Sequence, residues 1–449
     1  MTPLALFLLI LITLTHLPLA LAACECGYLA SVRPDETDTS THTTALFTDI
    51  LETDFSSFLP GSDDSGTKSI VGIDLYQHTP HWAPQAFNLS KERARGEYGE
   101  MFDVRNVRVV ESAEGRRSQE QGRGRGMLEL VVRSETVDGM VPVAELDTKG
   151  LDIMYGTFRA WMKVSGVNGT CAAFFWYFNN TQEIDMEFLS KDFNPSTNHF
   201  PINLVLQSRA SAEAGYDASS SDSTAAGNFV QANLPFDPTA DFHEYRIDYL
   251  PDLVVFYADG VPLASMSASA SGAAVPSTAG HLILSHWSNG NPLWSGGPPE
   301  VDSALQVKSV KAYFNASSSS SVPGHRRREE VESGERRCVD PAAPGAVCLI
   351  PDVVPGNRSA ADWFFTGQGS QSTPDGQGGE EEEEEEEKQN GGWRGRDVSG
   401  WWVMMGPYDP EVGNNQTNKT TYRAQPPPDG PIQNQRYGHT ATRTHGMVK

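Results

Sequence analysis

Residues 176–188 read WYFNNTQEIDMEF, and the second half of this stretch has the alternating pattern of a β-strand. If Gln182 to Phe188 forms a strand, successive side chains point to opposite faces. Apolar residues then lie on the face toward a core, and acidic residues lie on the other face. The acidic set is Glu183, Asp185 and Glu187, and the apolar set is Ile184, Met186 and Phe188.

The chain from Cys24 to about Asn315 contains many short stretches of this kind, separated by Gly, Asn, Asp and Ser clusters. Long amphipathic patterns of helical period are missing from it. Roughly 290 residues of regularly spaced strands indicate a two-sheet sandwich or jelly roll. Expected strands include 127–132, 155–162, 245–249 and 253–257, the last followed by a hairpin turn at 258–261.

The composition limits the classes of partner and site. The chain has 449 residues with 34 Lys+Arg against 58 Asp+Glu, and its net charge of −24 argues against a nucleic-acid partner. Its five Cys are too few for a disulfide-built scaffold and too scattered for a zinc site. A hydrophobic fraction of 38% is low for a fully folded protein of this size, so we expect part of the chain to be unfolded.

The two ends of the chain differ from its centre. Residues 4–22 are apolar and close on small residues, which is typical of a cleaved signal peptide. A retained membrane anchor and bacterial lipidation at Cys24 are the alternatives, but seven Asn-x-Ser/Thr sites favour a glycosylating secretory route. Residues 317–449 contain serine, arginine and glutamate runs that predict a disordered tail. We expect a secreted protein, extracellular or in a cell wall, with no stable membrane anchor.

Three carboxylates on one strand face repel one another and raise at least one pKa, which a purely structural strand would not need. Glycoside hydrolysis uses such groups: one carboxylate attacks the anomeric carbon and another protonates the departing oxygen. Alpha-carbons four residues apart lie ~13 Å apart, and two inclined Glu side chains leave about 5 Å between their carboxyls. That is the separation in a retaining enzyme, with Glu183 and Glu187 as the pair. A solvated acidic strand edge is the alternative interpretation.

Aromatic residues before and after this strand fit a carbohydrate site, because sugar rings stack their flat C–H faces on aromatic rings. Residues 174–178 read FFWYF, and residues 287–294 read WSNGNPLW. For any single one of these aromatic residues, packing in the core explains the pattern equally well. Asn203 and Gln207 alternate on an expected strand after the motif and could bind sugar hydroxyls.

Residues 183–189, EIDMEFL, resemble the E-x-D-x-E signature of glycoside hydrolase family 16, which contains lichenases, laminarinases and fungal cell-wall transglycosylases. Residues 150–159, 245–263 and 281–287 resemble the family's strand entering the cleft, its convex-sheet hairpin and its strand with a cleft tryptophan. The resemblance spans about residues 130–314. Gln182 departs from it, since many members carry Asp there.

The resemblance implies an all-β fold, a concanavalin A-like β-jelly roll, with a disordered C-terminal tail. It implies that Glu183 is the nucleophile, Asp185 an assisting acid and Glu187 the general acid/base. It also implies three regions: a signal peptide at 1–22, a catalytic domain at 23–316 and a low-complexity tail at 317–449. Substrate contacts are predicted for Trp176, Asn203, Trp287 and Arg159.

The function predicted from these features is that of a secreted endo-β-glucanase, a monomer that cuts β-1,3 or mixed β-1,3/1,4-glucan. A transglycosylase that passes the glycosyl group to another wall polysaccharide is the alternative enzyme. A carbohydrate-binding jelly roll is a non-enzymatic alternative. We predict no cofactor or metal: relatives carry a structural Ca²⁺, but the sequence has no compact ligand loop for one.

Disulfide pairing stays open at this point. The spacing favours a local bond between Cys338 and Cys348. Cys171 could then join Cys24 or Cys26, which leaves one thiol over. Four cysteines already allow three connectivities, so the sequence does not decide among them.

Overall fold

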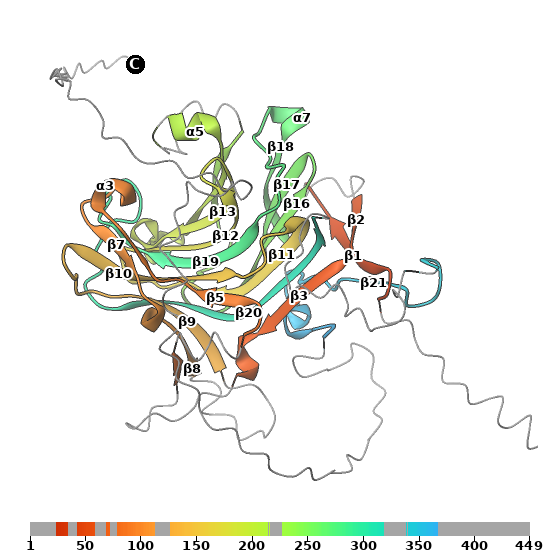
Figure 1. Ribbon diagram of the computed structural model, residues 1–449, viewed down its shortest axis with the longest axis horizontal. Coiled ribbons are helices and arrows are strands. Elements are labelled where there is room, and N and C mark those ends of the chain that lie inside the picture. The colour runs from red at the N-terminus through yellow and green to blue at the C-terminus, as the bar shows by residue number, and fades with distance from the viewer. Residues whose placement is uncertain are drawn as a thin grey trace, which may run out of the picture. The chain divides into compact units, whose positions relative to one another are not determined.

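The computed structural model describes residues 24–34, 43–58, 69–71, 79–112, 126–213, 215, 227–317, 338 and 340–366. They belong to a compact unit that spans Met1–Pro410, whereas the second unit, Glu411–Lys449, lies outside the described residues. The expected signal peptide and most of the expected tail also lie outside them. In the described part, two nine-stranded sheets form a sandwich (Figure 1), as the jelly-roll prediction requires.

The first large sheet, here called the front sheet, has the spatial order β15-β14-β13-β12-β19-β10-β7-β6, with β5 paired to β10. Its pairs are antiparallel except that of β10 with β7. Its strands are β5 Trp82–Pro84, β6 Phe87–Leu89, β7 Gly99–Phe102, β10 Met140–Thr148, β12 Cys171–Asn179, β13 Gln182–Leu189, β14 Pro201–Gln207, β15 Phe229–Asn233 and β19 His281–Trp287.

The second large sheet, the back sheet, has the order β18-β17-β16-β11-β20-β9-β8-β4, with β3 paired to β20. All of its pairs are antiparallel. Its strands are β3 Asp49–Asp54, β4 Ser69–Val71, β8 Val107–Glu111, β9 Gly126–Val132, β11 Ile153–Lys163, β16 His243–Leu250, β17 Leu253–Ala258, β18 Val261–Ser267 and β20 Ser303–Ala316.

A small third sheet joins the two ends of the described chain. β1 pairs antiparallel with β2 and parallel with β21. The described helices are short turns between strands. The small-sheet strands are β1 Gly27–Val32, β2 Thr43–Phe47 and β21 Val347–Leu349, and the helices are η1 Phe55–Ser57, α3 Lys91–Ala94, η2 Val104–Asn106, η3 Ser190–Asp192, η4 Pro195–Thr197, α5 Arg209–Glu213, α7 Ala268–Ser271 and η5 Ser359–Asp362.

The main core lies between the inner faces of the front and back sheets. Aromatic rings from the two sheets meet there: Phe188 and Tyr245 have centroids 4.7 Å apart, and Trp176 and Tyr249 are 5.0 Å apart. Burial of these large side chains is the main stabilising contribution that the sandwich makes. Each large sheet thus has one face in the core and one face turned away from it, and the candidate site lies on the outer face of the front sheet.

The local strand predictions are confirmed. Residues 182–188 lie in β13, residues 176–179 end β12, and 253–257 forms most of β17. The turn after β17 has two successive left-handed residues, Asp259 at φ 46° and Gly260 at φ 75°, as a two-residue hairpin of type I′ requires. Gly260 meets a second demand, because a Cβ at this position would lie 1.9 Å from the carbonyl oxygen of Val353.

Val353 belongs to a folded segment that lies beyond the predicted domain limit at 316 and contains 338–348, the one stretch of the tail that the sequence offers as structured. Residues 338 and 340–366, here called the C-terminal arm, pack on the domain although they fall within the predicted disordered tail. Ile350, Val353 and Phe364 are 3%, 0% and 5% exposed. A few apolar anchors spread through a polar stretch do not change its average composition, so composition alone does not reveal that the arm is folded.

The disulfides also correct the prediction. Cys24 is bonded to Cys348 and Cys26 to Cys338, so both bonds tie the arm to the start of β1, and Cys171 is a buried free thiol. The local Cys338–Cys348 pair is therefore wrong. The reason is topological: β21 pairs with β1, which brings the two ends of the domain together in a way that sequence spacing cannot show.

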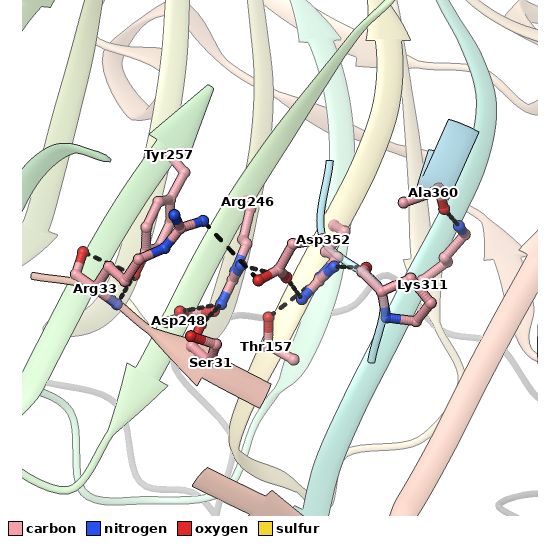
Figure 2. A network of polar contacts seen from close by, with 11 residues as sticks. Ser31, Arg33, Thr157, Arg246, Asp248, Tyr257, Lys311, Asp352 and Ala360 are labelled. Carbon is pink, nitrogen blue, oxygen red and sulfur yellow. Dashed lines mark hydrogen bonds and ion pairs between the residues drawn. The ribbon is translucent and has the colours of Figure 1, made fainter. Parts of the chain in front are cut away.

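The arm covers a buried network of charges on the outer face of the back sheet (Figure 2). Asp352 of the arm accepts hydrogen bonds from Arg159 at 2.8 Å and from Arg246 at 2.9 Å. Arg246 also makes a two-pronged pair with Asp248 at 2.7 and 2.6 Å, and Lys311 donates to a backbone carbonyl of the arm at 2.8 Å. Each buried charge in this network thus has a partner.

Candidate active site

Strand β13 presents its carboxylates as the alternation predicts. Ile184 and Met186 are fully buried in the main core, so the acidic side chains that alternate with them lie on the outer face of the front sheet. Asp185 is 3% exposed, whereas Glu183 and Glu187 are partly exposed. A substrate on this face can therefore reach the two outer carboxylates of the row.

The strand register decides which residues border this row. On β12, Tyr177, Phe175 and Ala173 lie opposite Glu183, Asp185 and Glu187. Because directly paired residues share a face, Phe175 and Tyr177 border the carboxylates. On the other side, β14 places one amide side chain at each end of the row: Gln207 opposite Glu183 and Asn203 opposite Glu187.

All three carboxyls of β13 have raised pKa values. Burial, and then the charges of its two neighbours, raise the pKa of Asp185 well above its usual range. Burial is also the main cause that raises the pKa of Glu183 and of Glu187, each to about 7. A hydrogen bond between the two side chains lowers the pKa of Glu183 and raises that of Asp185.

Glu187 has two hydrogen-bond donors of its own. The indole Nε1 of Trp294 donates to Glu187 Oε1 at 3.2 Å, and the Cys171 Sγ lies 3.7 Å from the same oxygen. Both contacts lower the pKa of Glu187 against the effect of burial. Trp294 comes from the connection between β19 and β20, and Cys171 begins β12.

A second group of carboxyls lies on the same face: Glu145 and Asp147 of β10 and Glu100 of β7. Burial raises the pKa of Glu100 to about 8, and it raises those of Glu145 and Asp147 well above their usual range. His281 Nε2 lies 3.7 Å from Asp147, but burial lowers the His281 pKa to about 4, so this imidazole is neutral at pH 7. Burial therefore outweighs the compensating charge near these carboxyls, which for Glu100 includes that of Arg95.

The structure places two of the four predicted substrate contacts on this face. Trp287 is partly exposed and lies opposite Cys171 in the register, and Asn203 lies opposite Glu187. Asn203 is 3% exposed and accepts a hydrogen bond from Gln231 at 3.0 Å. The side chain of Asn203 is therefore fixed in direction beside Glu187.

The other two predicted contacts, Trp176 and Arg159, are corrected. Trp176 is fully buried and pairs with Ile184, so its ring lies in the core, and its indole donates to the carbonyl of Ile153 at 3.0 Å. Arg159 lies on the back sheet, 3% exposed, paired with Asp352 of the arm. Trp176 is excluded from the site because it is paired with a residue whose side chain points into the core. Arg159 is excluded because it lies on the back sheet.

Several residues of this face were missed. Alternation in 143–147, VAELD, places Glu145 and Asp147 on one face, so this signal was present in the sequence. Glu100 carries no such signal, since it reaches the site through the spatial order of the strands. Trp294 belongs to the aromatic stretch 287–294 noted in the sequence, but its contact with Glu187, 107 residues away along the chain, is not visible there.

Among the described residues, no group of three or more His, Cys, Asp or Glu side chains is arranged to hold a metal ion. Within the same part of the chain, no helix has the length and apolar character needed to cross a membrane.

Comparison with known proteins shows that most of the residues on this face lie in a segment that resembles a known family. A family model for glycosyl hydrolases family 16 matches residues 143–305. The chain is 28% identical over 138 residues to a β-glucanase of Acetivibrio thermocellus, covering 30% of this chain and 34% of that protein. It is also 28% identical over 156 residues to the probable xyloglucan endotransglucosylase/hydrolase protein 27 of Arabidopsis thaliana, covering 32% and 41%. The chain thus spans less than half the length of these relatives.

Among solved structures, the endo-β-1,3-glucanase from Pyrococcus furiosus is similar to this chain with a TM-score of 0.41 and 18% identity, covering 64% of this chain and 100% of that one. The fold described above rests on the sheet order and the core rather than on this superposition. The segment matched by the family model contains the three carboxylates of β13, both carboxylates of β10, and Trp294.

Proposed function

Since residues 143–305 make this chain a member of glycoside hydrolase family 16, we propose that it is a retaining endo-β-glucanase acting on β-1,3 or mixed β-1,3/1,4-glucan. The observation that carries the proposal is the carboxylate row of β13, whose pKa values are all raised on a face that substrate can reach. Two glutamates four residues apart on one strand suit double displacement. Glu183 is the proposed nucleophile and Glu187 the proposed acid/base.

In the first step, ionised Glu183 attacks the anomeric carbon and forms an ester bond to the sugar. The bond to the leaving oxygen breaks, and protonated Glu187 gives that oxygen its proton. In the second step, Glu187, now a carboxylate, takes a proton from water. The oxygen of this water attacks the anomeric carbon, which releases Glu183 and retains the configuration.

The electrostatics support this division of roles. Glu183 and Glu187 each have a pKa of about 7 and influence each other, so they lose their protons in two steps that belong to the pair. Protonated Asp185 donates to Glu183 and favours its ionised form, which leaves the shared proton on Glu187. We expect a bell-shaped pH profile, with the acidic limb from the nucleophile and the basic limb from the acid/base.

The proposed substrate is an uncharged polysaccharide. A face carrying six carboxyls would repel an anionic glycan, and the partly exposed ring of Trp287 offers a stacking surface to a sugar. Asn203 and Gln207 add amides at the two ends of the carboxylate row, and Gln207 Oε1 is buried without a hydrogen-bond partner among the described residues. That oxygen would be satisfied by a sugar hydroxyl.

The second candidate is a glucan or chitin transglycosylase, in which a sugar hydroxyl replaces water in the second step. The similarity to a protein named endotransglucosylase/hydrolase favours keeping it. Both candidates use the same first step, so only the fate of the glycosyl-enzyme ester separates them.

Two disulfides indicate folding in an oxidising compartment, outside the cytosol. We infer that the protein is secreted, extracellular or in a cell wall, with residues 1–22 removed as a signal peptide. The catalytic domain then comprises residues 23–316 together with the C-terminal arm, and the monomer is the proposed working unit.

The test is to incubate the protein with barley mixed-linkage glucan, laminarin and chitin oligomers, measuring reducing ends and product lengths. Reducing ends should appear with glucan and should fall at least about a thousandfold with Glu183→Gln, which removes the nucleophile but keeps its size. Exposed Glu135→Gln is the matched control and should leave the rate unchanged. Longer products without new reducing ends would establish transfer, and inactivity on every glycan would refute both enzyme functions.

A further inference from the structure

The connection between β19 and β20 contains residues 288–297, here called the 288–297 loop, which contacts the proposed acid/base. We propose that this loop is a positioning element: Trp294 Nε1–H, together with Cys171 S–H, holds Oε1 of Glu187 and leaves Oε2 as the oxygen that gives and takes the proton. The proposal rests on the function proposed above and goes beyond it, since it assigns the reacting atom and the residues that orient it.

The two contacts to Glu187 converge on a single atom. Trp294 Nε1 lies 3.2 Å from Oε1 and Cys171 Sγ lies 3.7 Å from the same Oε1. The indole N–H is only a donor, and a thiol S–H donates weakly. An oxygen that accepts from both cannot also carry a proton pointing at them. We therefore place the proton of the neutral carboxyl on Oε2.

Cys171 remains a donor because its thiol keeps its proton. The residue is fully buried, and burial together with the charge of Glu187 raises the pKa of the thiol well above its usual range. A thiolate at this place would repel the Glu187 carboxylate. Cys171 is thus a neutral second donor behind the stronger indole contact.

The 288–297 loop is built so that Trp294 has little freedom, and Asn289 is its centre. The Asn289 side-chain oxygen accepts from Asn291 N and from Ser295 Oγ, both at 3.0 Å. Its amide nitrogen donates to the carbonyl of Ala94 at 2.7 Å and to Glu100 Oε1 at 3.1 Å. Asn289 and Ser295 are 3% and 0% exposed, so these bonds form away from competing water.

Backbone hydrogen bonds also hold this loop, both within the loop and between the loop and a neighbouring segment. Within it, Trp294 N and Gly296 N both donate to the carbonyl of Asn291, at 3.0 and 2.8 Å. Outside it, Tyr98 N donates to the carbonyl of Asn289 at 2.8 Å. Gly290 has φ +77°, and a Cβ there would lie 2.7 Å from the Tyr98 ring, so glycine is required at this position. The loop is therefore held at several points along its length.

The proposal predicts the direction in which the pKa of Glu187 changes when the donor is removed. A donor to Oε1 stabilises the charged carboxylate, so it lowers the pKa of Glu187 against the raising effect of burial. Removing the donor raises that pKa, and the acid/base then stays protonated to higher pH. The basic limb of the kcat/KM profile must therefore move toward higher pH.

The first experiment compares Trp294→Phe with wild type on the glucan that wild type cleaves. Phenylalanine keeps a ring but has no N–H, so we expect the basic limb to rise by about one pH unit. We also expect kcat to fall about tenfold, because the carboxyl loses its fixed direction. Trp363→Phe, an indole on the arm, is the control and should change neither quantity. An unmoved basic limb in folded Trp294→Phe would overturn the proposal.

A second experiment needs no activity, so its failure is distinct from failure of the proposed function. The Glu187 carboxyl is titrated by NMR in protein labelled with ¹³C at the glutamate carboxyls, with Glu187→Gln identifying its signal. We expect the midpoint to rise by about one unit in Trp294→Phe and by less in Cys171→Ala, with Cys171→Ser close to wild type. Equal midpoints in wild type, Trp294→Phe and Cys171→Ala would refute the proposal even if the enzyme cleaves glucan.

Discussion

The outer faces of the two large sheets differ in how far their buried charges are paired, although Glu244 on the back sheet is also a buried carboxyl with a raised pKa. On the front sheet, six carboxyls share one face, and burial raises their pKa values although the charge of Arg95 lowers those of Glu100, Glu183 and Glu187 in part. On the back sheet, Arg246 pairs with Asp248 and Asp352, and Arg159 pairs with Asp352, beneath the C-terminal arm (Figure 2). The arm covers the paired charges, whereas part of the carboxylate row on the front sheet stays accessible.

This difference distinguishes charged side chains that stabilise the fold from charged side chains that are proposed to take part in the reaction. A buried ion pair with good geometry can be retained by a fold because each partner satisfies the other. Carboxyls whose burial outweighs the compensating charge around them make folding less favourable, so their persistence on one face indicates a use that outweighs this effect. In this molecule, the proposed use is proton transfer on the front sheet and attachment of the arm on the back sheet.

The largest effect is expected from removing the arm's central charge. Asp352→Ala leaves two arginines, Arg159 and Arg246, that are 3% and 1% exposed with less compensating charge, and should lower the free energy of unfolding by about 3 to 5 kcal/mol. Chemical denaturation measures it. Asp302→Ala, which breaks a pair with Arg133 at a half-exposed carboxyl, is the control and should lose about 1 kcal/mol. Equal losses in the two variants would remove the contrast between the faces.

The covalent attachment of the arm should have the next largest effect. Replacing Cys24 and Cys348 together by Ala should lower the free energy of unfolding by about 3 kcal/mol. Cys26–Cys338 still closes the long loop, so the removed bond closes only a loop of about a dozen residues between the two bridges. Limited proteolysis should then cut within the arm, while reducing-end assays on the front-sheet site keep at least about half of wild-type activity at a temperature where the variant is folded. Loss of activity in that folded variant would contradict the independence of the two faces.

The comparison of the faces also explains what could be predicted. The alternation in β13 and the Asp259-Gly260 turn are local patterns, and the sequence predicts both correctly. Trp176 was misplaced because sheet parity, not residue type, decides its face: it lies opposite Ile184 and therefore in the core. Trp294 and Asp352 act on residues more than a hundred positions away in the chain. Such contacts depend on tertiary topology, which local periodicity does not contain.

A smaller effect is expected at Glu100, where its size depends on pH. Burial raises its pKa from 4.5 to about 8, so between these values the folded protein binds more protons than the unfolded chain, and stability falls as pH rises through that window. Glu100→Gln removes this loss and still accepts the hydrogen bond from Asn289. Thermal and chemical unfolding should therefore show no difference from wild type near pH 4 and a gain of about 2 kcal/mol at pH 8.

The matched variant on the back sheet is Glu129→Gln, whose carboxylate accepts from Arg108 at 3.0 and 2.8 Å. Because that carboxylate is paired, neutralising it should destabilise the protein at pH 8 by about 1 kcal/mol, opposite in sign to Glu100→Gln. If both variants lose stability at pH 8, the charged form of Glu100 is stabilised by its surroundings despite its burial. The distinction between the two faces would then be wrong. Opposite signs would show that a charge on Glu129 stabilises the fold, whereas a charge on Glu100 destabilises it.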